Sequence, residues 1–135
     1  MQIYCGTDII EVSRIEDAVR NTKGFKENVY TKNEIENIDR IRSNMKYQRY
    51  AGRFAAKEAI YKAMSKITIE NKLSMSYLDV EILNQDELFV RPKVYILNKD
   101  IKKICEDNEI EIDVSISHIK ENAISTVVVK VNKEW

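Results

Sequence analysis

Hydrophobic and polar positions alternate with different periods along this chain, and the periods predict which segments are strands and which are helices. Alternation is strict over Glu111–Ser117, so one face of a strand there would be apolar and the other polar. The β-rich run Ile3–Val12 and the valine-rich run Ala123–Val131 predict two further strands. Shorter apolar runs that would continue the sheet are Leu78–Leu83, Leu88–Val90 and Val94–Leu97, with Pro92 at an edge or a bend.

Helical periodicity follows two capping-box patterns. The spacing Ser13-x-x-Glu16 predicts a helix that begins near Arg14 and ends near Asn21–Gly24. The spacing Thr31-x-x-Glu34 predicts a second helix, which carries Ile35, Ile38 and Ile41 at helical intervals. A short helix is also expected over Asn98–Asp107.

One long helix is predicted from about Ser43 to Lys66. One side of it holds Glu58 within a stripe of small and aromatic residues, namely Tyr47, Ala51, Phe54, Ala55 and Tyr61, together with Lys62. The other side holds Ala56, Ile60, Ala63 and Met64. A helix that is small and apolar on two sides is buried on two sides, and in so short a chain the second side would suit another subunit. Helices and strands are mixed without regular βαβ alternation, so the class is α+β.

Composition narrows the class of protein. The 135 residues predict a single domain over 1–135 that buries a core without disulfides. No apolar run is long enough to span a membrane, and the first residues lack the pattern of a signal peptide. Cys5 and Cys105 lie far apart with no C-x-x-C motif, so we expect a reduced, cytoplasmic protein.

Charge is balanced overall but unevenly placed. Residues 1–66 hold 13 Lys and Arg against 9 Asp and Glu, and the remaining residues reverse this balance. The excess is too mild for a nucleic-acid-binding surface. It would suit an anionic small molecule, an acidic protein partner or a subunit interface, although a merely solvated surface is an equal alternative.

Asp8, Glu58 and Lys62 are the first candidates for chemistry. Asp8 interrupts a β-rich run, and Gly6 on the same strand face would let a ligand approach, although an aspartate at a strand end is often only a turn cap. Glu58 lies in an apolar stripe, where a carboxylate needs a partner. Lys62 at i+4 favours an intrahelical ion pair. With Asp8 added, the two carboxylates would instead suit Mg²⁺, with Lys62 as a phosphate-binding cation.

His118 and two arginines form a second set. His118 is the only histidine, which excludes a multi-histidine zinc site and leaves a structural role as the ordinary alternative. Arg49 and Arg53 lie one helical turn apart and would clamp a phosphate, unless they are simply solvated. No Walker A or G-x-G-x-x-G run is present.

Taken together, three motifs in this order resemble the holo-acyl-carrier-protein synthase family, the short type of 4′-phosphopantetheinyl transferase. The motifs are Gly6–Glu11 with Arg14-Ile15, Arg53–Ala59 with Lys62-Ala63, and Val114–His118. The resemblance covers nearly the whole chain, and it implies a small antiparallel sheet packed against a long central helix and shorter helices.

The resemblance also implies an activity: transfer of 4′-phosphopantetheine from coenzyme A to a serine of apo-acyl carrier protein, with adenosine 3′,5′-bisphosphate as the other product, in fatty-acid synthesis. By similarity Asp8 and Glu58 hold Mg²⁺, and both act in catalysis with Lys62. The positions that match coenzyme A contacts are Arg53, Lys62, Ser117 and His118. Arg14 matches a position that contacts the carrier protein. Arg20 would extend that basic surface, and its match is by charge type only. The family is typically a homotrimer with active sites at subunit boundaries. The alternatives are another Mg²⁺-dependent phosphoryl-transfer enzyme and a non-catalytic binder of an acidic protein.

Overall fold

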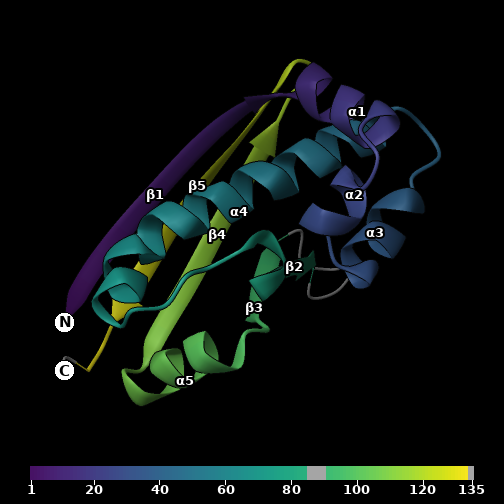
Figure 1. Cartoon of the computed structure of the whole chain (residues 1–135). Coiled ribbons are helices and arrows are strands. Elements are labelled where there is room, and N and C mark those ends of the chain that lie inside the picture. The colour runs from purple at the N-terminus through teal and green to yellow at the C-terminus, as the bar shows by residue number, and fades with distance from the viewer. Residues whose placement is uncertain (85–90, 134–135) are drawn as a thin grey trace.

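The principal sheet is built from the two ends of the chain. The computed structural model describes residues 1–84 and 91–133. Strands β1 (Gln2–Glu11), β5 (Asn122–Val131) and β4 (Ile110–His118) form an antiparallel sheet in the order β1-β5-β4. The register pairs Asp8 with Ser125, and Ser125 with Ile116. These strands and helices confirm the α+β class and the strands predicted at both ends of the chain (Figure 1).

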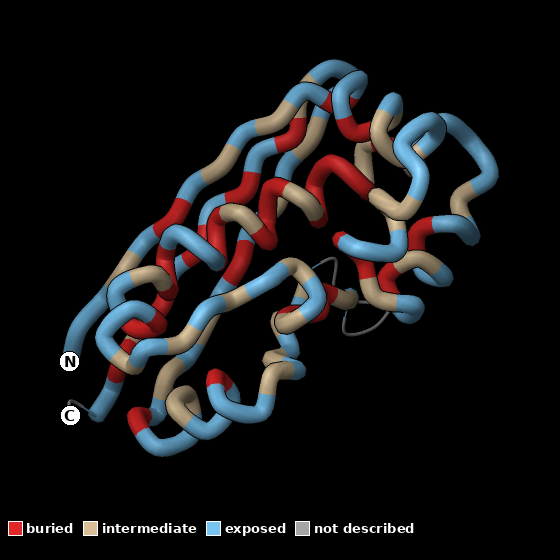
Figure 2. The backbone as a smooth tube through the Cα atoms, in the orientation of Figure 1, coloured by how far each residue is buried: buried red, intermediate tan, exposed pale blue. Residues whose placement is uncertain are grey.

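Helix α4 (Met45–Glu70) lies along one face of this sheet (Figure 1). Its small residues, including Ala56, Ala59 and Ala63, are buried in one core cluster with β-strand valines such as Val127 and Val129. Figure 2 shows buried stretches along the helix and along the sheet that it covers. Gly6 permits this close packing, because a Cβ there would lie 2.0 Å from the carbonyl oxygen of Ala59. The expectation that Gly6 leaves room for a ligand is therefore wrong: the helix backbone fills that space.

Shorter elements pack at the two ends of α4. Helices α1 (Val12–Asn21), α2 (Phe25–Val29) and α3 (Lys32–Asp39) surround the amino-terminal half of α4 (Figure 1). The turn η1 (Tyr77–Asp79) leads into β2 (Val80–Asn84), which pairs with β3 (Pro92–Ile96) before α5 (Lys99–Asp107). Thr31 caps α3 with the predicted reciprocal bonds to Glu34. Asn98 caps α5 through its side chain.

Several predicted details differ. Helix α1 begins at Val12 with Glu11 as N-cap and no side-chain cap bond, so the predicted capping box at Ser13 is wrong. The long helix begins two residues later and ends four residues later than predicted, and α2 was not predicted. Strands β2 and β3 form a separate two-stranded sheet instead of continuing the first. The predicted strand at Leu88–Val90 lies outside the described residues.

The face of the principal sheet turned away from α4 is exposed. Ile9 of β1 is 63% exposed and stands opposite Ile124 of β5, which is 40% exposed. Ile3 and Val128 on the same face are 55% and 39% exposed. Large apolar side chains in one continuous, solvent-facing sheet surface are typical of an interface. Within residues 1–84 and 91–133, no helix has the length and apolarity needed to cross a bilayer.

Candidate active site

Lys62 links helix α4 to the middle of strand β1. Its Nζ atom lies 3.3 Å from Asp8 Oδ1 and donates a hydrogen bond of 3.0 Å to the carbonyl oxygen of Thr7. Asp8 lies on the face of β1 that meets α4, because the side chains of a strand alternate between faces and Gly6 on the same face contacts Ala59. The predicted ion pair between Glu58 and Lys62 is not found among the described residues, and Lys62 pairs with Asp8 instead.

Glu58, one turn before Lys62, is held by a tyrosine. The Tyr77 hydroxyl donates a hydrogen bond of 2.5 Å to Glu58 Oε1. Burial, the hydrogen bond to Glu58 and the charges of Glu58 and Asp8 together raise the pKa of Tyr77 to about 12, with burial as the largest cause. Glu58 lies on α4 one turn before Lys62, which contacts Asp8, so the packing of β1 on α4 brings the two carboxylates to neighbouring turns although 50 positions of sequence separate them.

The donor set fits a magnesium ion better than a transition metal. Within the described residues no group of three or more His, Cys, Asp and Glu side chains forms a metal cage. Two carboxylates, Asp8 and Glu58, supply hard oxygen atoms, and Mg²⁺ commonly takes one or two carboxylates together with waters and substrate phosphates. A pocket of about 320 Å³ opens beside Glu58, and Tyr61 and Tyr77 also lie in its wall. The two carboxylates therefore suit a metal that is completed by a phosphate-bearing substrate.

A second site lies on the other side of α4. Arg49, Arg53 and His118 line a small cavity of about 100 Å³ together with Gly52, Asn84, Pro92 and Ile116. Arg53 is 8% exposed, and its guanidinium donates to Asn84 at 3.3 Å. The Nε atom of Arg49 is buried without a hydrogen-bond partner within the described part of the chain.

Positive charge in this cavity lacks a matching acid. The pKa of Arg53 is lowered to about 10, chiefly by burial and in part by the charge of Arg49, while Glu34 opposes the shift. Burial and the charges of Arg49 and Arg53 also lower the pKa of His118. Among the described residues no ion pair of either arginine is found. Two guanidiniums and an imidazole around a cavity form a receptor for an anion.

The structure does not unite the two groups of predicted residues within one chain. Asp8 lies on the edge strand β1 and His118 on the opposite edge strand β4, with β5 between them and α4 across the face. No residue lines both cavities. Ser117 is exposed, and the strand alternation puts it on the outer face, away from His118. A substrate that contacts all of these side chains would therefore need residues of two copies of the chain.

Comparisons with known proteins identify the family. The family model of the 4′-phosphopantetheinyl transferase superfamily matches residues 4–127. The holo-[acyl-carrier-protein] synthase of Fusobacterium nucleatum is 40% identical over 96% of this chain and 99% of its own length, and that of Clostridium tetani is 34% identical over 96% and 97%. This chain belongs to the 4′-phosphopantetheinyl transferase superfamily.

Solved structures of family members agree with the fold. The Bacillus anthracis synthase in complex with coenzyme A is 32% identical, with a TM-score of 0.71 over 93% of this chain and 94% of that one. The Helicobacter pylori synthase in complex with coenzyme A is 31% identical, with a TM-score of 0.71 over 93% and 99%. The long helix packed on a small antiparallel sheet is thus the transferase fold that the motifs implied.

One buried ion pair supports the site of this transferase and was missed from the sequence. Lys57 Nζ lies 2.8 Å from Glu34, and both side chains are almost fully buried. The same Nζ donates to the carbonyl oxygens of Val29, Tyr77 and Val80 at 2.8–3.0 Å. Burial lowers the pKa of Lys57, whereas Glu34 opposes the shift. The only signal in the sequence is a charged Lys-Glu pair inside a small, apolar helix, and that pattern does not indicate that the lysine is buried.

The predicted carrier-binding arginines lie on α1. Arg14 and Arg20 are both exposed. Arg20 also lies 3.2 Å from Glu16 and stacks over the Tyr47 ring at 4.8 Å. Arg14 and Arg20 thus present two guanidiniums to solvent, the second of them partly compensated by an acid.

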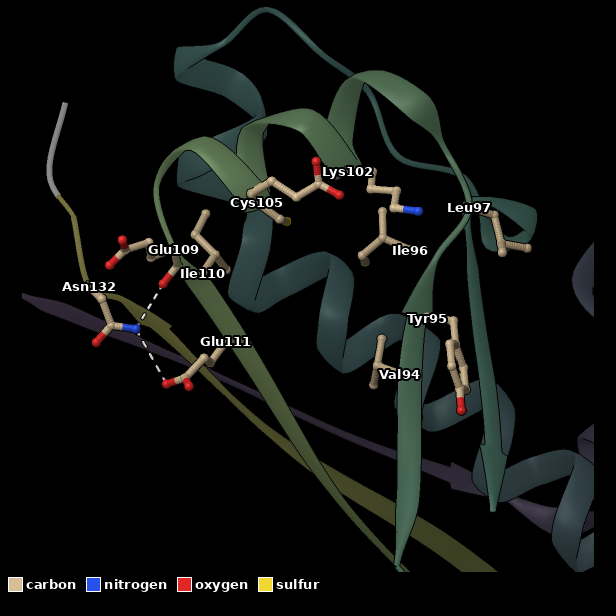
Figure 3. A pocket seen from close by; sticks show the side chains of 11 residues that line it. Val94, Tyr95, Ile96, Leu97, Lys102, Cys105, Glu109, Ile110, Glu111 and Asn132 are labelled. Atoms are coloured by element: carbon tan, nitrogen blue, oxygen red, sulfur yellow. Dashed lines mark hydrogen bonds between the residues drawn. The ribbon is translucent and has the colours of Figure 1, made fainter. Parts of the chain in front are cut away.

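Another pocket lies far from these groups. It measures about 620 Å³ and opens between β3, α5 and β4 (Figure 3). Asn132 Nδ2 donates across it to the carbonyl oxygen of Glu109 and to Glu111, at 2.8 and 3.3 Å. Burial raises the pKa of Cys105, which also lines it, to about 11, so the thiol stays protonated and unreactive near neutral pH. None of the predicted transferase residues lines this pocket.

Proposed function

We infer that this protein is active as a holo-acyl-carrier-protein synthase. It transfers 4′-phosphopantetheine from coenzyme A to a serine hydroxyl of apo-acyl carrier protein. The serine oxygen attacks the phosphorus that carries pantetheine, the bond to the bridging oxygen breaks, and adenosine 3′,5′-bisphosphate leaves while the hydroxyl loses its proton. The observation that supports this conclusion is the contact of Lys62 with Asp8, one helical turn from Glu58 and its pocket, in a chain of this family.

We propose that Asp8 and Glu58 hold a magnesium ion. When bound there, Mg²⁺ neutralises charge on the pyrophosphate and on the leaving bisphosphate. Asp8 is also placed to orient the attacking serine or to accept its proton through a water. Lys62, which now lies on Asp8, is half exposed and free to turn its ammonium group toward a phosphate as charge develops there.

The arginine cavity would anchor the other end of coenzyme A. Buried Arg53 and half-buried His118, with Arg49 beside them, offer a positive site of a size that suits a single phosphate group. Because this cavity and the Asp8–Glu58 pair open on different sides of α4, one coenzyme A would lie between two protomers, with Ser117 reaching it from the outer sheet face.

Such an arrangement requires self-association, and we propose the homotrimer that is typical of this family. The exposed apolar sheet face around Ile9, Ile124 and Val128 is the surface that supports this assembly. A carrier protein, which is acidic, would meet Arg14 and Arg20 on α1, and this contact should weaken with salt. Cys5 and Cys105 are free thiols. We propose that the protein acts in the cytoplasm, in fatty-acid synthesis.

One incubation tests the activity against its alternatives. Apo-acyl carrier protein, coenzyme A and Mg²⁺ are mixed with the protein, and intact-mass spectrometry follows the carrier. A mass gain of one phosphopantetheine group, dependent on the enzyme and abolished by a chelator, is expected. Binding of the carrier without a mass gain would identify a non-catalytic binder. Consumption of coenzyme A without modification of the carrier would identify a different phosphoryl-transfer enzyme.

A further inference from the structure

Tyr77 lies where it can fix the orientation of a catalytic carboxylate. Its hydroxyl donates to Glu58 Oε1 at 2.5 Å, across 19 positions of sequence. No other hydrogen bond or ion pair of Glu58 is found within residues 1–84 and 91–133. A half-buried glutamate on a helix has several rotamers available, and a single short hydrogen bond from a fixed donor selects among them.

The donor itself is fixed from three directions. The Tyr77 ring stacks on Phe54, with centroids 5.5 Å apart and planes inclined by 30°. The carbonyl oxygen of Tyr77 accepts a hydrogen bond of 2.8 Å from the buried Lys57. Ser76 and Asp79 close a reciprocal cap around the same turn. The hydroxyl is therefore held by the fold before Glu58 binds anything, and its position does not depend on Glu58.

We propose that Tyr77 is a positioning residue for Glu58: its hydroxyl holds the carboxylate in the orientation that ligates Mg²⁺ and uses one lone pair of Oε1, so that the remaining lone pairs face the substrate pocket. This inference rests on the metal role of Glu58 in the proposed function. Groups that hydrogen-bond a metal ligand commonly change metal affinity or activity by about 10- to 100-fold when they are removed.

The matched variants are Tyr77→Phe and Tyr95→Phe. The first keeps the ring and its stacking on Phe54 and removes only the hydroxyl. The second removes a hydroxyl from β3, away from the Glu58 pocket, where Tyr95 is exposed and makes no hydrogen bond within the described part of the chain. Circular dichroism and thermal melts first establish that both variants keep the wild-type fold.

The readout is metal binding without turnover. Mn²⁺ is titrated into each protein with coenzyme A but no carrier protein, and free Mn²⁺ is measured by electron paramagnetic resonance against a protein-free blank. We expect Tyr77→Phe to weaken Mn²⁺ binding about tenfold and to raise the half-activating Mg²⁺ concentration by the same factor. Tyr95→Phe should bind Mn²⁺ like the wild type, and the KM for coenzyme A at saturating Mg²⁺ should stay the same in both variants.

Two results would overturn the inference, and only the second would also contradict the metal role of Glu58. If the wild type binds Mn²⁺, Glu58→Gln abolishes that binding and Tyr77→Phe leaves it unchanged or tighter, Tyr77 only packs and the proposed function stands. If the wild type binds no Mn²⁺ and transfers phosphopantetheine without a divalent metal, the metal role of Glu58 fails together with that of Tyr77.

Discussion

Lys62 Nζ lies 3.3 Å from Asp8 Oδ1, which joins the middle of helix α4 to a strand 54 positions earlier in the chain. Because the Lys62 side chain is 53% exposed, this ion pair contributes at most about 1 kcal/mol to stability. The pair matters for chemistry, because it holds an exposed cation next to a carboxylate, one helical turn from Glu58. Removal of the cation should therefore affect turnover far more than folding.

We predict that Lys62→Met lowers kcat by about 10²-fold, because a cation that stabilises developing phosphate charge is lost. The melting temperature should change little. Lys103→Met is the control, since Lys103 forms an exposed i,i+4 pair with Asp107 on α5. Steady-state transfer to carrier protein, followed by mass spectrometry, measures both. Equal kcat in the two variants would show that Lys62 has no part in the chemistry.

Glu58→Gln should abolish transfer and leave the fold intact. The amide oxygen still accepts a hydrogen bond from Tyr77, so the packing is conserved, but the charge that would bind Mg²⁺ is gone. The rate is measured over a range of Mg²⁺ concentrations, beside a thermal melt. Near-normal rates at low Mg²⁺ would contradict the metal role of Glu58.

Gly6 and Gly52 make a matched test of the packing between sheet and helix. A Cβ at Gly6 would lie 2.0 Å from the Ala59 backbone oxygen, which cannot move without displacing α4. A Cβ at Gly52 would lie 2.8 Å from Cγ2 of Ile116, the end of a side chain that can rotate. Gly6→Ala should therefore cost about 3 kcal/mol or more and Gly52→Ala about 1 kcal/mol, by chemical denaturation. The opposite order would contradict this packing.

The sequence predicted the elements well where pattern and local chemistry agree. The Thr31–Glu34 capping box was found as expected, because both of its bonds are local. The Ser13–Glu16 pattern failed because the backbone NH of Val12 already bonds to the carbonyl oxygen of Glu121 in the adjoining turn, and the helix begins there. A tertiary contact sets the start of this helix, and a local capping pattern cannot predict such a contact.

The site shows the same division. The order of the motifs indicated Asp8, Glu58 and Lys62 as candidate site residues. It did not indicate that Lys62 pairs with Asp8 on the strand and not with Glu58. Tyr77 and the buried pair of Glu34 and Lys57 went unnoticed, because their partners lie 19 to 23 positions away and no local spacing reports them. Long-range hydrogen bonds of this kind are set by the fold as a whole.

His118 should titrate below its ordinary range. Burial and the charges of Arg49 and Arg53 lower its pKa from 6.5, so the neutral imidazole is favoured in the folded protein. The unfolded chain then binds the proton more readily, and folding stability should fall as the pH drops below 6.5 through the lowered pKa. Because this is the only histidine, its NMR signal is unambiguous.

Coenzyme A should reverse that shift. A phosphate placed among the two guanidiniums and His118 favours the imidazolium, so the pKa of His118 should rise on binding. An NMR titration with and without coenzyme A measures the change, and His118→Gln serves as the assignment control. A pKa that stays the same on addition of coenzyme A would place the phosphate elsewhere.

The separation of Glu58 and His118 on two sides of α4 leads to a test by complementation. If each active site combines Glu58 of one protomer with His118 of the next, Glu58→Gln and His118→Ala should each be strongly impaired. Trimers reassembled from an equal mixture should nevertheless regain about a quarter of wild-type activity, because random assembly restores that share of the sites. Light scattering confirms that reassembly has occurred, and separately kept variants are the control. If the mixture is no more active than its parts, both residues act within one chain, and the proposed boundary site is wrong.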